Sequence, residues 1–236
     1  MIRLRSFLYA VGLVLFTPLY TLVILLSFPF APQTRYRVIR PWSKIMLAWL
    51  RLTCGLSYRV IGAENIPATP SIVLSKHQSA WETLAFQSIF PPQVWVLKRE
   101  LLRLPFFGWA LAQSSPIAID RGTARLALKQ LLDQGKQRLA DGFWVVIFPE
   151  GTRIKPGQKG KYKVGGAWLA THTGALVVPV AHNAGEFWGR NAFLKHPGTI
   201  TVSIGPPLDP AGKKADDLTA QVEAWIEGEM PRLRSL

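Results

Sequence analysis

From Gly55 to the end of the chain, short apolar runs with the composition of β-strands alternate with longer stretches of helical pattern. The candidate strands are residues 58–61, 72–74, 94–97, 117–119, 143–148, 176–181 and 199–204. The candidate helices are residues 80–89, 123–139, 165–173 and 215–234. Several of the runs are apolar throughout, as is typical of strands covered on both faces. The alternation predicts an α/β fold in which helices flank a mostly parallel central sheet.

The N-terminal part of the chain has a different pattern. No charged residue occurs between Arg5 and Arg35, and most residues from 7 to 30 are apolar. Such a segment is long enough to cross a hydrocarbon core, which takes about 20 residues. Bulky residues and prolines occupy the place where a signal peptide would be cleaved, so we expect the segment to be retained. We therefore divide the chain into a membrane-anchoring helical region at 1–54 and a globular domain at 55–236.

The basic residues leave two topologies open for the apolar segment. Eight basic residues and no acidic one precede Glu64, and most of the eight follow the segment. If the segment spans the membrane, this bias predicts a cytoplasmic globular domain. Pro18 near its middle fits equally a bent helix that enters one leaflet. Residues 42–52 have apolar side chains at helical spacing among basic ones, which fits either an interfacial helix or a helix packed on the core.

The overall charge indicates an anionic partner. The chain has 28 Lys and Arg against 14 Asp and Glu, a net charge of +14, and it is rich in Trp and Phe. Nucleic acid and anionic lipid are the leading partners for such a composition. The basic stretch 157–163 fits a solvated surface loop. A single cysteine, Cys54, excludes an internal disulfide framework and a zinc site built from several cysteines.

Residue types that carry out chemistry cluster directly after three of the candidate strands. The three clusters are His77, the pair Asp120-Arg121 and the run Pro149–Arg153. In a parallel sheet, functional side chains collect at the loops beyond the carboxyl ends of the strands. The clusters therefore predict one shared site.

The first cluster pairs His77 with Glu82, five residues further on. A histidine suits general-base work near neutral pH, and a carboxylate can hold its ring in the required tautomer. A hydrogen-bonded structural pair is the other interpretation. The remaining histidines have no ligand-like spacing to His77, which argues against a metal site. No Gly-x-Ser-x-Gly motif occurs, so we expect the substrate to carry the attacking hydroxyl.

The third cluster reads Phe-Pro-Glu-Gly-Thr-Arg at 148–153. Gly151 permits close approach of the backbone to a ligand, Thr152 offers a hydroxyl, and Arg153 offers a planar fork for phosphate. Arg121 could supply a second guanidinium to the same pocket. The pattern predicts a phosphomonoester or carboxylate substrate. Nucleotide-binding signatures are absent from the sequence, so a nucleoside triphosphate is not expected.

These clusters resemble the ordered sequence blocks of the glycerolipid acyltransferases, specifically the bacterial type of 1-acylglycerol-3-phosphate acyltransferase. The first block of the family, His-x4-Asp, is matched at 77–82 with Glu82 in place of the aspartate. The second, third and fourth blocks are matched at 117–121, 148–153 and 177–181. The resemblance extends over about residues 70 to 205.

The resemblance implies that His77 takes a proton from the sn-2 hydroxyl of lysophosphatidic acid and that Glu82 orients and stabilises His77. The acyl donor would be acyl-CoA or acyl-acyl carrier protein as co-substrate, the product phosphatidic acid for phospholipid synthesis, and no metal or other cofactor would take part. The implied substrate-binding residues are Arg121, Glu150, Gly151, Thr152, Arg153 and Pro179. Within this set we expect Glu150 to organise its loop and Pro179 either to shape the pocket or to be a rigid position in its strand.

The anchor and the basic excess fit a site at the bacterial inner membrane, with the catalytic domain on the cytoplasmic side. Membrane lipids and an acidic carrier protein would then be partners. Two other interpretations are open. One is an acyltransferase of the same family with a different lysolipid acceptor. The other is a membrane-anchored nucleic-acid-binding or lipid-binding protein without catalysis, but nucleic acid is not expected because it leaves the four blocks unexplained.

Overall fold

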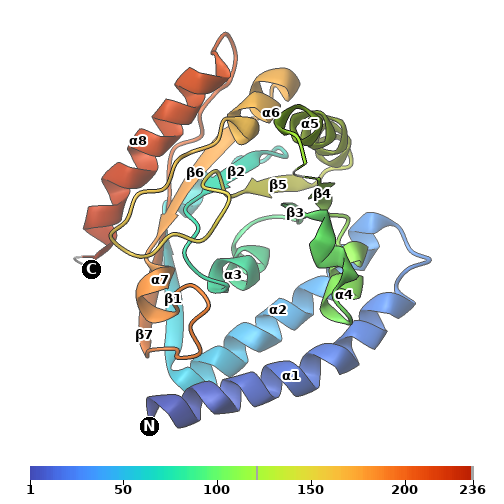
Figure 1. Ribbon diagram of the computed structural model, residues 1–236, viewed down its shortest axis with the longest axis vertical. Coiled ribbons are helices and arrows are strands. Elements are labelled where there is room, and N and C mark those ends of the chain that lie inside the picture. Colours follow the sequence, from blue (N-terminus) through green and yellow to red (C-terminus); the bar gives the residue numbers. More distant parts are fainter. Residues whose placement is uncertain (121, 235–236) are drawn as a thin grey trace.

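Seven strands form one central sheet in the computed structural model, which describes residues 1–120 and 122–234 (Figure 1). The strands are β1 (Leu56–Ile61), β2 (Ile72–Ser75), β3 (Gln93–Lys98), β4 (Ile117–Ile119), β5 (Trp144–Ile147), β6 (Val177–His182) and β7 (Gly198–Ile204). Their spatial order is β1-β7-β6-β2-β5-β3-β4. Within the described chain, neighbouring strands pair in parallel except β6 and β7, which are antiparallel. The predicted mostly parallel α/β fold is confirmed.

Helices cover both faces of the sheet. They are α1 (Ile2–Leu26), α2 (Pro32–Cys54), α3 (Trp81–Ile89), α4 (Phe107–Gln113), α5 (Ala124–Ala140), α6 (Gly165–Thr173), α7 (Ala184–Phe187) and α8 (Ala215–Arg234), with short 3-10 helices η1 (Ala63–Asn65) and η2 (Arg99–Arg103). One hydrophobic cluster packs α1, α2 and α3 on one face, and a second packs α5, α6 and α8 on the other. The sequence pattern did not predict α4 and α7. Both are short and contain glycine, so their local signal is weak.

Strand register brings the loops after β2 and β5 together. Leu74 of β2 is paired with Ile147 of β5, so both strands end at the same edge of the sheet. The next residues of each strand form adjacent loops, and the backbone N–H of Ile154 donates to the carbonyl of His77 at 2.8 Å. The first and third sequence clusters therefore meet at one place, as parallel pairing requires.

Helix α1 lies against the domain along its whole length (Figure 1). Near its start, the Ser6 hydroxyl accepts from the backbone N–H of Lys195 at 2.9 Å, and Tyr9 is fully buried. Near its end, Tyr20 donates to the carbonyl of Val38 at 2.9 Å. In the part of the chain that the structure describes, α1 is the one helix long and apolar enough to cross a membrane by length and composition. Its other side exposes many apolar side chains, among them Phe7, Leu8, Val11, Val14, Leu15, Leu19, Leu22 and Leu26.

Helix α2 packs one face on the core, which is one of the two alternatives left open for residues 42–52. Its buried side chains recur at helical spacing and are Tyr36, Ile39, Ser43, Met46, Leu50 and Cys54. The helix begins with Pro32 at its first position and ends at Gly55, whose φ of 67° suits glycine at a helix C-terminus. Because α1 and α2 share a hydrophobic cluster with the sheet, the N-terminal region is packed as part of the same core as the globular domain.

Candidate active site

His77 and Glu82 form a hydrogen-bonded pair at the carboxyl end of β2. His77 lies in the loop after the strand, and Glu82 lies in the first turn of α3. The distance from His77 Nδ1 to Glu82 Oε1 is 2.8 Å. The same carboxylate oxygen accepts from the backbone N–H groups of Gln78 and Ser79 at 2.9 and 2.8 Å. Three donors on one oxygen hold the carboxylate where it can accept the Nδ1 proton, which leaves Nε2 of His77 for a substrate.

The environment keeps Glu82 ionised. Its side chain is fully buried, and burial alone would raise the pKa of the carboxyl. Electrostatic interaction with His182, the hydrogen bond and electrostatic interaction with His77, and the hydrogen bond from the Ser79 N–H together lower the pKa of Glu82 below its ordinary value. The His77 ring is also stacked on Phe148, with 3.8 Å between ring centroids and 12° between ring planes. Both the edge and the face of the imidazole are therefore fixed.

A buried ionic network lies directly behind this pair. Glu150 Oε2 accepts from the backbone N–H of His77 at 2.9 Å, and Glu150 Oε1 accepts from Lys76 Nζ at 2.7 Å. Lys76 Nζ also contacts Glu227 Oε1 of α8 at 2.8 Å, and the Tyr162 hydroxyl donates to that same oxygen at 2.9 Å. Burial raises the pKa of Glu150 despite the opposing effect of Lys76. Glu150 thus ties the loop after β5 to the loop that carries His77.

Gly151 and Arg153 lie in the loop after β5 and border the same cavity as His77. Gly151 has a φ of 67°, and a Cβ atom there would lie 2.8 Å from Lys163 Nζ, so a side chain would crowd this approach. Gly151 and Arg153 both line the cavity described below, together with Lys161 and Lys163. The two lysines belong to the basic loop 157–163 and are exposed, as expected, but they stand at the mouth of this cavity.

Two of the predicted site residues that the structure describes are not part of this cluster. Thr152 is exposed and is not among the residues lining the cavity. Pro179 is buried within β6, opposite Leu74 of β2, and its ring lies close to Gly205, so the structure places it in the sheet rather than at the cavity wall. That position corrects the prediction that Pro179 shapes the pocket and fits the alternative of a structural position in the strand. Arg121 lies outside the described residues.

The cavity beside His77 has a volume of about 1020 Å³ and mostly apolar walls. Thr21 and Ile24 of α1, Trp42 of α2 and Phe107 of α4 form part of its wall on one side of the sheet. Leu128 of α5 and other side chains line it on the opposite side. The cavity therefore extends around the ends of β3 and β5. The imidazole of His77 and the cationic side chains of the basic loop border this same cavity.

A histidine paired with a carboxylate, cationic side chains and apolar walls border one cavity, a combination that suits acyl transfer to a lipid. The sequence comparison identifies the family. The sequence model of the Acyltransferase family matches residues 57–183. The chain belongs to the acyltransferase family. The match includes the loops of His77, Glu82 and Arg153, whereas the cavity-lining side chains of α1 and α2 and Glu227 of α8 lie outside it.

Known relatives agree with this assignment. The acyltransferase is similar to a 1-acyl-sn-glycerol-3-phosphate acyltransferase from Pseudomonas aeruginosa, 48% identical over 216 residues that cover 88% of this chain and 84% of the relative. It is similar to an enzyme of that name from Borreliella burgdorferi, 31% identical over 73% of this chain and 68% of the relative. Its fold matches the crystal structure of the 1-acyl-sn-glycerophosphate acyltransferase PlsC from Thermotoga maritima with a TM-score of 0.82, over 99% of this chain and 96% of that one, at 23% sequence identity.

Sequence reasoning missed Lys76, Tyr162 and Glu227 of the acyltransferase. Lys76 directly precedes His77, and its side chain is almost completely buried. A lysine at the end of an apolar strand is a weak signal of a buried partner, because lysine is rarely buried unless it is paired. Glu227 has no local signal, since it is 151 residues from Lys76 along the chain.

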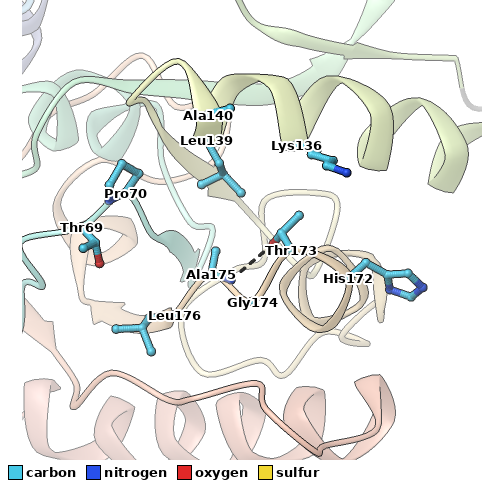
Figure 2. A pocket seen from close by; sticks show the side chains of 10 residues that line it. All are labelled: Thr69, Pro70, Lys136, Leu139, Ala140, His172, Thr173, Gly174, Ala175 and Leu176. Atoms are coloured by element: carbon cyan, nitrogen blue, oxygen red, sulfur yellow. Dashed lines mark hydrogen bonds between the residues drawn. The ribbon is translucent and has the colours of Figure 1, made fainter.

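A second, smaller cavity of about 560 Å³ lies at the opposite edge of the sheet, before β2 and β6 (Figure 2). Figure 2 shows Lys136 and His172 extending away from Thr69 and Pro70 rather than toward a common centre. The Nδ1 atom of His172 is 2.8 Å from the carbonyl of Trp168, within its own helix. The polar side chains of this cavity therefore form no convergent set, and the chemistry is assigned to the larger cavity.

Proposed function

We propose that this acyltransferase transfers a fatty acyl group from a thioester, acyl-CoA or acyl-acyl carrier protein, to the sn-2 hydroxyl of 1-acyl-glycerol-3-phosphate. The product is phosphatidic acid, the precursor of phospholipids. The observation that carries the proposal is the placement of His77, Arg153 and Lys163 on one cavity with apolar walls. The names of the Pseudomonas and Borreliella relatives support the same acceptor.

His77 acts as the general base in this reaction. Its Nε2 accepts the proton of the lysolipid hydroxyl while the hydroxyl oxygen attacks the carbonyl carbon of the thioester. The carbon–sulfur bond then breaks, and the leaving thiolate takes the proton back from His77. The ionised carboxylate of Glu82, 2.8 Å from Nδ1, stabilises the imidazolium that exists between these two transfers.

Arg153 and Lys163 bind the phosphate of the acceptor. Both border the cavity on the side of Gly151, where the lack of a side chain permits close approach of a ligand to the backbone. An arginine supplies a planar pair of donors and a lysine a point charge, and a phosphomonoester with two negative charges can use both. Arg121 belongs to the same proposal through its sequence block alone.

The apolar part of the cavity holds a fatty acyl chain, and its wall includes side chains of α1. Because α1 packs on the domain with one face and exposes an apolar face along its length, we place it in one leaflet, parallel to the membrane surface. The lysolipid then reaches the site without leaving the bilayer. We place the enzyme on the cytoplasmic side of the bacterial inner membrane, where the basic excess meets anionic lipids and an acidic carrier protein.

The test is release of free thiol from a long-chain acyl-CoA in detergent micelles, with lysophosphatidic acid present or absent. Release that requires the acceptor and is lost in His77→Ala supports the proposal. A parallel reaction with acyl-acyl carrier protein identifies the donor, and a panel of other lysophospholipids tests the acceptor. If the enzyme prefers a lysophosphodiester, that lipid and not lysophosphatidic acid is the acceptor. Undiminished turnover in the presence of a metal chelator is expected, because the proposed steps use no metal.

A further inference from the structure

A second apolar surface lies on residues 101–109, which span the end of η2 and the start of α4; we refer to it as the 101–109 segment. Five bulky apolar side chains in it are exposed by 39–47%: Leu101, Leu104, Phe106, Phe107 and Trp109. A contiguous apolar surface of this kind on a folded protein indicates a binding surface for another molecule or a membrane.

The 101–109 segment adjoins the exposed apolar face of α1. Helix α4 packs against α1, and the two lie side by side in Figure 1. The Thr21 hydroxyl of α1 donates a hydrogen bond to the carbonyl of Phe106 at 3.5 Å. Around that contact, α1 exposes Leu15, Leu19 and Leu22. Two parts of the chain that are 85 residues apart at this contact therefore present adjoining apolar side chains.

The turn that presents Phe106 is a defined structure. Phe106 has a φ of 58° and a ψ of −65°, a conformation that costs energy for a residue with a side chain. Backbone bonds hold the turn, with the N–H of Gly108 donating to Leu104 at 2.8 Å and that of Ala110 donating to Phe106 at 2.9 Å. A Cβ atom at Gly108 would lie 2.5 Å from the carbonyl of Leu101, so this close turn requires glycine. The fold thus holds an aromatic ring outward at an energetic cost, which a ligand for the ring would offset.

Basic residues adjoin this apolar surface. Lys98, Arg99 and Arg103 are exposed at the end of β3 and on η2, with Glu100 as the acidic residue among them. Apolar side chains next to arginine and lysine are typical of segments that enter a membrane interface, because the cations stay with the headgroups while the rings enter the acyl region. Charge and continuity with α1 therefore select an anionic bilayer over a protein partner.

We propose that the 101–109 segment inserts into the anionic membrane surface beside α1 as a second anchor. Phe106 and Trp109 enter the acyl region, and Arg99 and Arg103 contact the headgroups. Leu101 and Phe107 of the same segment line the large cavity. The inserted segment is consequently the wall between the bilayer and the cavity, which places the lysolipid entrance between the segment and α1; this last step rests on the proposed function.

Membrane insertion is measured with an environment-sensitive fluorophore on an introduced cysteine. The native Cys54 is buried, so Phe106→Cys provides the accessible thiol. Leu19→Cys on α1 is the positive control, and Lys136→Cys, at the opposite edge of the sheet, is the negative control (Figure 2). With vesicles of phosphatidylglycerol and phosphatidylcholine, we expect a blue shift and a severalfold intensity rise at positions 106 and 19, and none at 136. A spectrum at position 106 that stays aqueous while position 19 responds overturns the proposal.

A double variant separates insertion from catalysis. Phe106 and Trp109 are not among the residues lining the cavity, so Phe106→Ser with Trp109→Ser leaves turnover of micellar substrate intact. Loss of two inserted aromatic rings weakens partition into anionic vesicles by at least about tenfold. Unchanged partition of the folded double variant overturns the second anchor. Because partition is measured without substrate, this result does not depend on whether the proposed acyl transfer is correct.

Discussion

Lys76 and Glu227 form an ion pair of 2.8 Å that joins the residue before His77 to helix α8. The same ammonium contacts Glu150 at 2.7 Å, and Glu150 in turn accepts from the backbone of His77. Lys76 is 1% exposed and Glu150 is 0% exposed at their side chains, so water screens their interaction little. Through these contacts α8 determines where the histidine loop is held, although no part of α8 is near the histidine in sequence.

Removing the charge of Lys76 should destabilise the protein. In Lys76→Met the carboxylate of Glu150 stays buried without its cation, a situation that typically costs about 3–5 kcal/mol. The free energy of unfolding, measured by urea denaturation, should fall by an amount of this order. Lys76→Met with Glu150→Gln should recover part of the loss, because the buried charge is then gone.

The matched control for this change is Lys159→Met. Lys159 pairs with Glu223 on α8 at 2.7 Å, but its side chain is 61% exposed, and solvent-exposed pairs contribute little. Its urea midpoint should equal that of the unchanged protein. Equal midpoints for Lys76→Met and Lys159→Met would contradict the view that the buried network stabilises the loop.

Glu227→Gln should affect catalysis more than substrate binding. The substitution weakens the hold of α8 on Lys76 while leaving the Lys76–Glu150 pair in place, so the loop of His77 becomes less well positioned. We expect kcat to fall by about tenfold with little change in KM for lysophosphatidic acid, because positioning of the base acts on the transition state. Glu227→Asp should restore part of the rate. A change in KM alone would show that Glu227 acts on substrate binding instead.

His77→Ala and Glu82→Gln should both lose activity without unfolding. A positioned general base contributes about 10²–10⁴-fold to a rate, which sets the expected loss in His77→Ala. Glu82→Gln keeps the shape but removes the charge that stabilises the imidazolium, so kcat should fall substantially while the acyl-CoA KM changes little. Thiol release at saturating acceptor measures both. An active His77→Ala enzyme would refute the proposed base.

Arg153→Met should raise the KM for lysophosphatidic acid by about 10–100-fold, since a hydrogen bond to a charged group is worth about 1.5–3 kcal/mol. The KM for acyl-CoA should change less. Arg153→Lys keeps the charge and loses the planar fork, so its KM for lysophosphatidic acid should lie between those of the unchanged enzyme and Arg153→Met. An acceptor panel run in parallel checks the phosphate: a neutral acceptor should be used equally well by Arg153→Met and the unchanged enzyme.

His182 should make the fold sensitive to mild acid. Its ring is fully buried, with Nε2 donating to the carbonyl of Lys76 at 2.9 Å, and Nδ1 accepting from the backbone N–H of Ala184 at 3.3 Å. Burial lowers the pKa of His182 below the ordinary 6.5. Glu82 and the hydrogen bond to the Lys76 carbonyl oppose this effect, and electrostatic interactions with His77 and the Lys76 ammonium add to it. Between the lowered pKa and 6.5, the unfolded chain binds more protons than the folded one.

The free energy of unfolding should therefore decrease as the pH falls below about 6.5 and level off with respect to this group below its folded-state pKa. Glu82, whose pKa is lowered, adds a further loss at more acidic pH, as its stabilisation disappears on protonation. Urea denaturation between pH 5 and 7.5 on the unchanged protein and on His182→Gln measures the difference. The same pH slope in both proteins would contradict a buried neutral His182.

Local sequence patterns were sufficient to predict most of the longer elements and the family of this protein. Strand runs such as 72–74 and 143–148 are apolar throughout, and helices such as α5 and α8 are long and periodic, so their local patterns are strong. His77 and Glu82 are five residues apart, and a loop followed by one helical turn is enough to bring them together. Short elements such as α4 had too few residues for a pattern, and their position came from packing against α1 and η2.

Which distant groups lie together follows from the packing of the whole chain and not from any local pattern. Sequence order brings neither Glu227 nor Tyr162 near Lys76, and it does not show that Pro179 lies in the sheet while Lys161 and Lys163 stand at the cavity mouth. It left open whether α2 packs on the core, and it did not reveal that α1 and the 101–109 segment form one apolar surface. The physical reason is the same in each case: burial and pairing depend on how strands and helices are stacked, and that stacking is set by the whole core rather than by neighbouring residues.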